Sequence, residues 1–237
     1  MIPKVIHYCW FGHKPMSIAE KQCIQSWIKF FPDFDIKEWN ESNFDINQFD
    51  YTREAYKAKK FAFVSDVARL YALIKEGGIY FDTDITVLQN FPKTLFSHNA
   101  FAGFEMNQYV GTAVLASCPN HFFFKKILES YCKQHFDLFF KYDTTTNVQR
   151  ITAMLKNNGL ICNNTLQHIA DITIYPQSYF CNKNYETGEF YISKDSLTVH
   201  NFSNSWSTPS FVGRLWKTLH LPNTNLCQKF ADFIHKF

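Results

Sequence analysis

The 237-residue sequence lacks a concentrated charge of either sign. Lysine and arginine total 24 against 21 acidic residues, so the net charge is only +3, and the basic residues are scattered along the chain. Proteins that bind nucleic acid usually gather Lys and Arg on one face or in one segment. We therefore expect no nucleic-acid partner.

The sequence also lacks the cysteine pattern of a disulfide framework or a zinc finger. Its seven cysteines include no Cys-x-x-Cys pair, and an odd number cannot all be paired within one chain. Reduced thiols, which are typical of a cytoplasmic protein, are the simpler interpretation.

Long hydrophobic runs are absent as well. The opening residues, MIPKVIHYCW, have neither the basic stretch, the apolar run nor the cleavage site of a signal peptide. No run of about 18 uncharged apolar residues occurs, as a membrane-spanning helix needs. We expect a cytoplasmic protein, with peripheral contact to the cytoplasmic face of the inner membrane as an alternative. In the tail, residues 212–237, basic and apolar side chains are interleaved, which suits either a membrane surface or a packed amphipathic helix.

Aromatic residues, in contrast, are abundant. The chain has 26 Phe and 12 Tyr, and 46% of its residues are apolar, which is enough for a full core. This length is typical of one large domain. We therefore expect a single domain over residues 1–237.

Strand-like and helix-like segments alternate in the first half of the chain. Strands are expected at 4–10, 34–39 and 79–81, and helices at 18–30, 51–60 and 61–76. Ser17 is a suitable helix N-cap, and Gly77 can close the last helix in the left-handed conformation. The less regular second half suggests strands at 100–105, 112–117, 171–175 and 197–201 and helices at 121–135 and 146–157. The pattern predicts an α/β fold with a mixed sheet flanked by helices.

Asp82 and Asp84 follow the short apolar strand at 79–81. If Asp82-Thr-Asp84 is extended, both carboxylates project to the same side at the carboxyl end of a strand, where open α/β sheets bind ligands. A hard divalent cation would remove the repulsion between them and keep positions open for substrate phosphates. An isolated Asp-x-Asp more often only caps a turn, but this one follows an apolar helix, Gly77-Gly78 and an apolar strand.

The segment FAFVSDVARLY at 61–71, continued by GGIYFDTD at 77–84, resembles the signature of glycosyltransferases with a DXD sugar-binding region. That family includes the yeast initiating mannosyltransferase and bacterial capsule enzymes, and the glucosyltransferase domains of large clostridial toxins are similar at a greater distance. The opening IPKVIHYCWFG at 2–12 and the late HNFSNSW at 200–206 also match, in the family's order.

The resemblance implies a GT-A fold with a Rossmann-like sheet, a nucleotide-sugar donor, Mn²⁺ or Mg²⁺ as cofactor, and transfer with retention of anomeric configuration. Residues 1–120 would form the nucleotide-sugar and metal-binding half, and residues 121–237 the acceptor-side half with a closing loop and a tail helix. A UDP-sugar is the preferred donor, and GDP-mannose is the alternative. The expected acceptor is a saccharide or lipid-linked saccharide in bacterial surface polysaccharide or lipopolysaccharide synthesis.

Carried over by position, the resemblance also assigns roles to single residues. Trp10 would stack on the nucleotide base, Asp66 and Arg69 would contact the donor sugar, Asp82 would reach the ribose and metal, and Asp84 would bind the metal most directly. Asp66, Arg69 and Asp84 are the catalytic candidates. Other interpretations remain open, because Asp66 and Arg69 have the spacing of an intrahelical ion pair and Trp10 could simply pack in the core.

The late motif supplies the remaining candidates. His200 ends an apolar strand, and its imidazole could complete a Mn²⁺ site with Asp82 and Asp84, although a lone His is more often an ordinary hydrogen-bonded residue. Ser205 and Trp206 would bind the donor from a loop that closes over the diphosphate, with the indole N–H directed at a phosphate oxygen.

Four alternative functions share parts of this pattern. A glycoside hydrolase would need two carboxylates on separate elements. A sugar-nucleotide phosphohydrolase or a nucleotidyltransferase would use the same metal site but release other products, and a non-catalytic carbohydrate-binding module would show no turnover. An Asp-x-Asp pair suits a single cation, which favours glycosyl transfer over glycoside hydrolysis.

Overall fold

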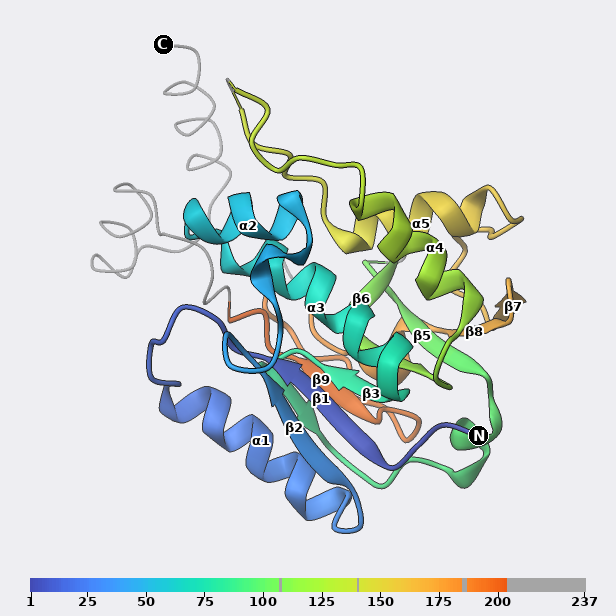
Figure 1. The fold of residues 1–237 in the computed structure, drawn as a ribbon. Helices are drawn as coiled ribbons and strands as arrows, with labels where there is room; N and C mark the ends of the chain where they lie inside the picture. The colour runs from blue at the N-terminus through green and yellow to red at the C-terminus, as the bar shows by residue number, and fades with distance from the viewer. Residues whose placement is uncertain (107, 140, 185–186, 204–237) are drawn as a thin grey trace, which may run out of the picture. The chain divides into compact units, whose positions relative to one another are not determined.

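A seven-stranded mixed sheet forms the centre of the described part of the chain, which is residues 1–203 without positions 107, 140 and 185–186 (Figure 1). In this computed structural model the strand order is β2-β1-β3-β6-β5-β8-β7. The strands are β1 (Val5–Cys9), β2 (Asp35–Trp39), β3 (Gly78–Phe81), β5 (Ala100–Glu105), β6 (Tyr109–Ser117), β7 (Gln167–Ile169) and β8 (Ile172–Tyr175). β1 runs parallel to β2 and β3, whereas β6 is antiparallel to both of its neighbours.

A separate two-stranded ladder joins β4 (Ile85–Val87) to β9 (Thr198–His200). The two strands are antiparallel, and Ile85 lies opposite His200. Because β4 follows β3 after a short turn, the ladder carries a late segment of the chain to the end of a central strand.

Helices cover both faces of the sheet (Figure 1). They are α1 (Ile18–Phe30), α2 (Asp50–Lys57), α3 (Phe61–Glu76), α4 (Phe122–Tyr131), α5 (Asn147–Lys156) and α6 (Gln177–Phe180), with short 3-10 helices at Ile46–Gln48 and Lys93–Ser97. One hydrophobic cluster packs the four helices α2, α3, α4 and α5 against one face of the sheet. A second cluster packs α1, α6 and β4 against the other face. Successive residues of β3 alternate between them: Tyr80 packs in the first, and Ile79 and Phe81 in the second.

The predicted α/β fold with a mixed sheet flanked by helices is confirmed. The sheet contains strands from both sides of residue 120, and the described residues belong to one compact unit, Met1–Ser203. The single domain over 1–237, with its division at residue 120, stays a prediction. Ser205, Trp206 and the predicted tail helix lie outside the described residues. No helix in the described ranges has the length and apolar character needed to cross a bilayer.

Local sequence signals explain how α1 and α3 begin and end. Ser17 caps α1 in a capping box with Glu20, as its position predicts. Gly77 closes α3 with φ of 67° and ψ of −163°, so its positive φ is confirmed but the predicted left-handed helical conformation is wrong. A side chain at this position would also meet Pro119 at 2.6 Å. The position therefore requires glycine for two reasons.

His7 holds the turn after α3 in place. Trp39 donates its indole N–H to Nδ1 of His7 at 3.0 Å, so the ring carries its proton on Nε2 and donates it to the carbonyl of Gly77 at 2.7 Å. His7 is completely buried, and this burial lowers the pKa of its imidazole. A second ring proton would remove the acceptor that Trp39 uses.

We expect the free energy of unfolding to decrease as the pH falls below about 6.5, since the unfolded chain then binds a proton that folded His7 does not. The loss from this group reaches at most about 1.4 kcal/mol per pH unit, down to the folded pKa. Urea unfolding across this pH range would measure it. A His7→Gln variant keeps an acceptor and a donor but cannot titrate, so its decline should be shallower; equal slopes would contradict the assignment.

Candidate functional site

Asp82 and Asp84 lie in the turn between β3 and β4. Asp82 donates its backbone N–H to Ala113 of β6 at 2.9 Å, and its carbonyl accepts from Ile85 at 3.0 Å, which closes a four-residue turn. The segment is therefore not extended, and the expected alternation of side chains is wrong as an explanation. The turn brings the two carboxylates together by another route.

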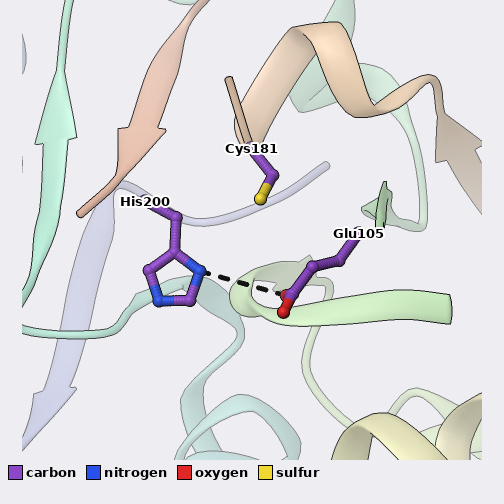
Figure 2. A group of neighbouring side chains, drawn as sticks. All are labelled: Glu105, Cys181 and His200. Atoms are coloured by element: carbon purple, nitrogen blue, oxygen red, sulfur yellow. Dashed lines mark ion pairs between the residues drawn. The ribbon is translucent and has the colours of Figure 1, made fainter. Parts of the chain in front are cut away.

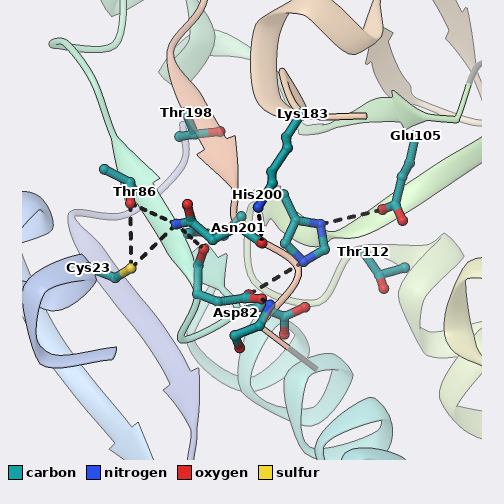
Figure 3. A network of polar contacts seen from close by, with 12 residues as sticks. Cys23, Asp82, Thr86, Glu105, Thr112, Lys183, Thr198, His200 and Asn201 are labelled. Atoms are coloured by element: carbon teal, nitrogen blue, oxygen red, sulfur yellow. Dashed lines mark hydrogen bonds and ion pairs between the residues drawn. The ribbon is translucent and has the colours of Figure 1, made fainter. Parts of the chain in front are cut away.

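β9 brings His200 to this turn. The Nε2 atom of His200 lies 3.4 Å from Oδ1 of Asp84. Asn201, the next residue, binds the carbonyl of Asp84 through its backbone N–H at 3.0 Å and through Nδ2 at 2.8 Å, and Ser203 donates its N–H to Oδ2 of Asp84 at 2.8 Å. Figure 3 shows His200 and Asn201 reaching the turn from β9. The late motif is thus fixed to the Asp82–Asp84 turn by its backbone as well as by its side chains.

Asp82, Asp84 and His200 together offer two carboxylate oxygens and one imidazole nitrogen, all within 4.8 Å of one another. Each side chain is partly exposed, by 27% for Asp82 and 13% for the other two. Burial lowers the pKa of His200, but Asp84 and the nearby Cys181 and Glu105 outweigh it and hold that pKa well above its ordinary value. Burial raises the pKa of Asp84, but His200 and Ser203 outweigh it and lower that pKa. The pair is set to exist as imidazolium and carboxylate, and the oxygen-rich donor set fits a hard divalent cation in place of the proton.

Arg69 lies between the carboxylates of Asp66 and Asp82. Its guanidinium is 3.2 Å from Oδ1 of Asp66 and 3.2 Å from Oδ1 of Asp82, and it donates to the carbonyl of Thr112 at 2.8 Å. It also covers the ring of Tyr80, whose hydroxyl donates to Oδ1 of Asp82 at 2.9 Å. Only 5% of Arg69 is exposed. Burial lowers the pKa of Arg69, but the charges around it raise that pKa, so the group stays a cation.

Asp66 is engaged on both oxygens. Oδ1 pairs with Arg69, and Oδ2 accepts the backbone N–H of Asn147 at the start of α5 at 3.0 Å. Burial raises the pKa of Asp66 in spite of these partners. The intrahelical ion pair that the sequence allows is therefore formed, and the role of Asp66 toward a sugar stays a prediction.

Trp10 follows the last residue of β1 and is partly exposed. It lines a cavity of about 410 Å³ with the loop residues His13 and Lys14, with Glu38 of β2 and with Glu41 from the segment after β2. Its indole N–H donates to the carbonyl of Lys14. Trp10 is therefore a wall of an open cavity, not a residue of the core, which fits the predicted stacking on a base.

Glu105 is the site residue that the sequence did not reveal. It ends β5, its side chain is 12% exposed, and Oε2 lies 3.9 Å from Nδ1 of His200 (Figure 3). Asp84 lies at the other ring nitrogen, Nε2. Burial and the charges of Asp82 and Asp84 raise the pKa of this carboxyl, although His200 opposes the shift. The only signal in the sequence is its position at the end of a strand.

Comparison with known proteins identifies the segment that holds most of these residues. Residues 17–102 match the family described as glycosyltransferase sugar-binding region containing DXD motif. This segment is similar to a DXD sugar-binding region. The matched segment contains Asp66, Arg69, Asp82 and Asp84, whereas Trp10 and His200 lie outside the match.

One similar protein is Subversion of eukaryotic traffic protein A of Legionella pneumophila, with 26% identity over 127 residues. The match covers 42% of this chain and 20% of that protein, so the chain spans about a fifth of this relative. Three solved glycosyltransferase structures are also similar. A glycosyltransferase involved in glycosylation of the major capsid of PBCV-1 has a TM-score of 0.47 and 10% identity over 85% of this chain and 95% of its own. Galactosyltransferase LgtC in complex with donor and acceptor sugar analogs has a TM-score of 0.46 and 13% identity, over 92% of this chain and 98% of its own. PaToxG glycosyltransferase has a TM-score of 0.39 and 23% identity, over 54% of this chain and 58% of its own.

Replacing Arg69 by Met should destabilise the protein strongly, because Asp66 and Asp82 would lose their buried counter-charge. We expect the free energy of unfolding at neutral pH to fall by about 3–5 kcal/mol. Arg53 and Asp50 form a matched control, an ion pair of the same i,i+3 spacing whose side chains are about half exposed. Arg53→Met should cost only about 0–1 kcal/mol. Urea unfolding of both variants measures the difference, and equal losses would contradict the role given to Arg69.

Proposed function

We propose that the protein is a divalent-metal-dependent glycosyltransferase that moves a sugar from a nucleotide-sugar donor to a saccharide acceptor. The observation that carries the proposal is the convergence of Asp82, Asp84 and His200 within 4.8 Å, at the turn of a DXD sugar-binding region. A catalytic cation of this kind needs a small number of protein ligands and open positions for phosphate oxygens. The partial exposure of all three side chains meets that need.

Asp82, Asp84 and His200 would hold Mn²⁺ or Mg²⁺. When bound, the cation supplies positive charge against which a nucleoside diphosphate leaves. Its ligands are oriented by neighbours in the chain. Asn201 and Ser203 fix Asp84, and Arg69 with the Tyr80 hydroxyl fixes Asp82. This support is what a preorganised site requires.

The remaining candidates would bind the donor. Trp10 offers a flat apolar face for the base at the edge of its cavity, and Arg69 offers a rigid fork of donors. Its fork is already shared among Asp66, Asp82 and Thr112, so a sugar hydroxyl would have to join this network. Ser205 and Trp206, which lie outside the described residues, would close over the diphosphate.

We propose retention of anomeric configuration by attack from the face on which the diphosphate leaves. The leaving phosphate takes the proton of the acceptor hydroxyl, and the bond from the anomeric carbon to the phosphate oxygen breaks as the bond to the acceptor oxygen forms. Among the described residues, Glu105 is a further carboxyl beside the site, and it faces His200 at 3.9 Å. That contact favours a supporting role for Glu105 over a nucleophilic one.

A UDP-sugar is the first donor to test, and GDP-mannose is the second. A saccharide or lipid-linked saccharide of a bacterial surface polysaccharide or lipopolysaccharide is the proposed acceptor. The proposed location is the cytoplasm or the cytoplasmic face of the inner membrane. The competing function with the same site is sugar-nucleotide hydrolysis at the diphosphate, which releases sugar phosphate and nucleoside monophosphate. Release of nucleoside diphosphate, and only when a saccharide acceptor is present, would separate transfer from hydrolysis.

Binding of the nucleotide should require the cation and Asp84. We expect UDP or a UDP-sugar to raise the melting temperature of the wild type in the presence of MnCl₂ and not with EDTA, because only the folded state binds. At a ligand concentration about 100 times Kd, the stabilisation is about 2.7 kcal/mol. Asp84→Asn should lose the shift.

Asp33→Asn is the matched control, since Asp33 is an exposed carboxylate in an ion pair with Lys4 outside the site. It should retain the full shift. The same panel with GDP and GDP-mannose distinguishes the two donor classes. The absence of a Mn²⁺-dependent shift with every nucleotide would remove the support for glycosyl transfer.

A further inference from the structure

A second group of metal-binding side chains lies on the other side of the His200 ring. Glu105, Cys181 and His200 each place one ligand atom within 4.8 Å of the others (Figure 2). Oε2 of Glu105 is 3.9 Å from Nδ1 of His200, whereas Asp84 lies at Nε2. One imidazole therefore separates two clusters and presents a different nitrogen to each.

The Nδ1 atom of His200 is buried and has no hydrogen-bond partner among the described residues. Buried polar atoms without partners are rare and point to an absent ion or water. Cys181 is 5% exposed, and burial raises the pKa of its thiol although His200 opposes the shift. The site thus contains an unsatisfied nitrogen beside a shielded thiol and a carboxyl.

The backbone around Cys181 is fixed to β9, the strand that carries His200. Cys181 follows the last residue of α6 and donates its backbone N–H to the carbonyl of Gln177. On its two sides, the Thr198 hydroxyl donates to the carbonyl of Phe180 at 2.7 Å, and Asn182 donates to the carbonyl of Thr198 at 2.9 Å. These hydrogen bonds hold Cys181, which follows α6, at a fixed position relative to His200 of β9.

The space between the three side chains is small. It has a volume of about 10 Å³ and is bounded also by Gly103 and Gly111. A side chain at Gly111 would meet Oε2 of Glu105 at 2.8 Å. The cavity holds about one water-sized species, so it suits a single ion and excludes an organic ligand.

Thiolate, imidazole and carboxylate together are the ligands that Zn²⁺ selects, whereas Mg²⁺ and Mn²⁺ favour oxygen. With bonds of 2.0–2.3 Å, tetrahedral zinc ligands lie about 3.3–3.8 Å apart. The 3.9 Å separation of Glu105 and His200 is close to this range. A shift of a few tenths of an ångström would bring this pair into the range.

We propose that Glu105, Cys181 and His200 form a binding site for Zn²⁺ or a similar thiophilic ion, and that its occupation excludes His200 from the cation site at Asp82 and Asp84. A neutral imidazole has one nitrogen with a free lone pair and one that carries hydrogen. Zinc at Nδ1 leaves the hydrogen on Nε2, facing Asp84. A cation at Nε2 leaves it on Nδ1, facing Glu105. Binding of zinc releases two protons to solvent, the thiol proton of Cys181 and the Nδ1 proton of the His200 imidazolium. The exclusion, but not the zinc site itself, rests on the proposed function.

Co²⁺ reports on the site directly, because thiolate coordination gives an intense charge-transfer absorption in the near ultraviolet. Metal-free full-length protein should develop this band with one equivalent of Co²⁺ and lose it on addition of one equivalent of Zn²⁺. Cys181→Ser should show no band, and Cys132→Ser, at an exposed cysteine, should keep it. No band in the wild type, or a band that survives in Cys181→Ser, overturns the site.

Glu105→Gln is a second variant, independent of the thiol. It should keep the band but weaken Zn²⁺ binding by about 10–100-fold, as loss of a supporting carboxylate does at zinc sites. Unchanged affinity would remove Glu105 from the site.

The exclusion of His200 from the cation site is tested through the affinity for Mn²⁺, which is measured from the electron paramagnetic resonance signal of the free ion. One equivalent of Zn²⁺ should weaken Mn²⁺ binding by about tenfold or more in the wild type and leave it unchanged in Cys181→Ser. Unchanged Mn²⁺ affinity in the wild type overturns the exclusion. Asp84→Asn should lose Mn²⁺ binding while it keeps the cobalt band, so failure of the glycosyltransferase proposal and failure of the zinc site give different results.

Discussion

The buried charge of Arg69 is the constraint on which the rest of the site depends. An isolated cation inside a protein is costly, and Asp66, Asp82, the Thr112 carbonyl and the Tyr80 ring together compensate it. These partners belong to α3, to the turn after β3, to β6 and to β3 itself. The guanidinium therefore fixes how the helix, the two central strands and the first aspartate of the DXD turn meet, and the apolar clusters on both faces form around that junction.

The second constraint is a shared imidazole. His200 belongs to β9, yet its ring is enclosed by Asp84 on one side and by Glu105 and Cys181 on the other. Asn201 adds a backbone and a side-chain hydrogen bond to the same turn, so the ring has little freedom to change its orientation. Binding at one nitrogen consequently affects the other, because a neutral imidazole has a free lone pair on only one of its two nitrogens and carries hydrogen on the other.

Much of the fold could be predicted because its signals are local. The bounds of α1, α3 and β5 follow from a Ser cap, a glycine stop and an apolar run, and the structure has them as predicted. The short strands β4 and β7 and helix α6 were not predicted, because three or four residues carry no periodicity that separates them from loops. In the site, the sequence indicated that Asp82, Asp84 and His200 could meet. It could not indicate the turn that joins the aspartates, nor Glu105 and Cys181, whose proximity to His200 exists only through the pairing of β4 with β9 and the packing of α6. The roles assigned to Trp10, Asp66, Ser205 and Trp206 stay predictions.

The ladder between β4 and β9 also has a consequence for the order in which the protein is made. Asn201 binds the Asp84 carbonyl across 117 positions of sequence, and long-range pairing of this kind forms late because the loop between the partners must first be closed. During synthesis on the ribosome, the DXD turn emerges well before the strand that completes it. A nascent chain therefore presents both acidic side chains before the histidine that completes their cluster has been made.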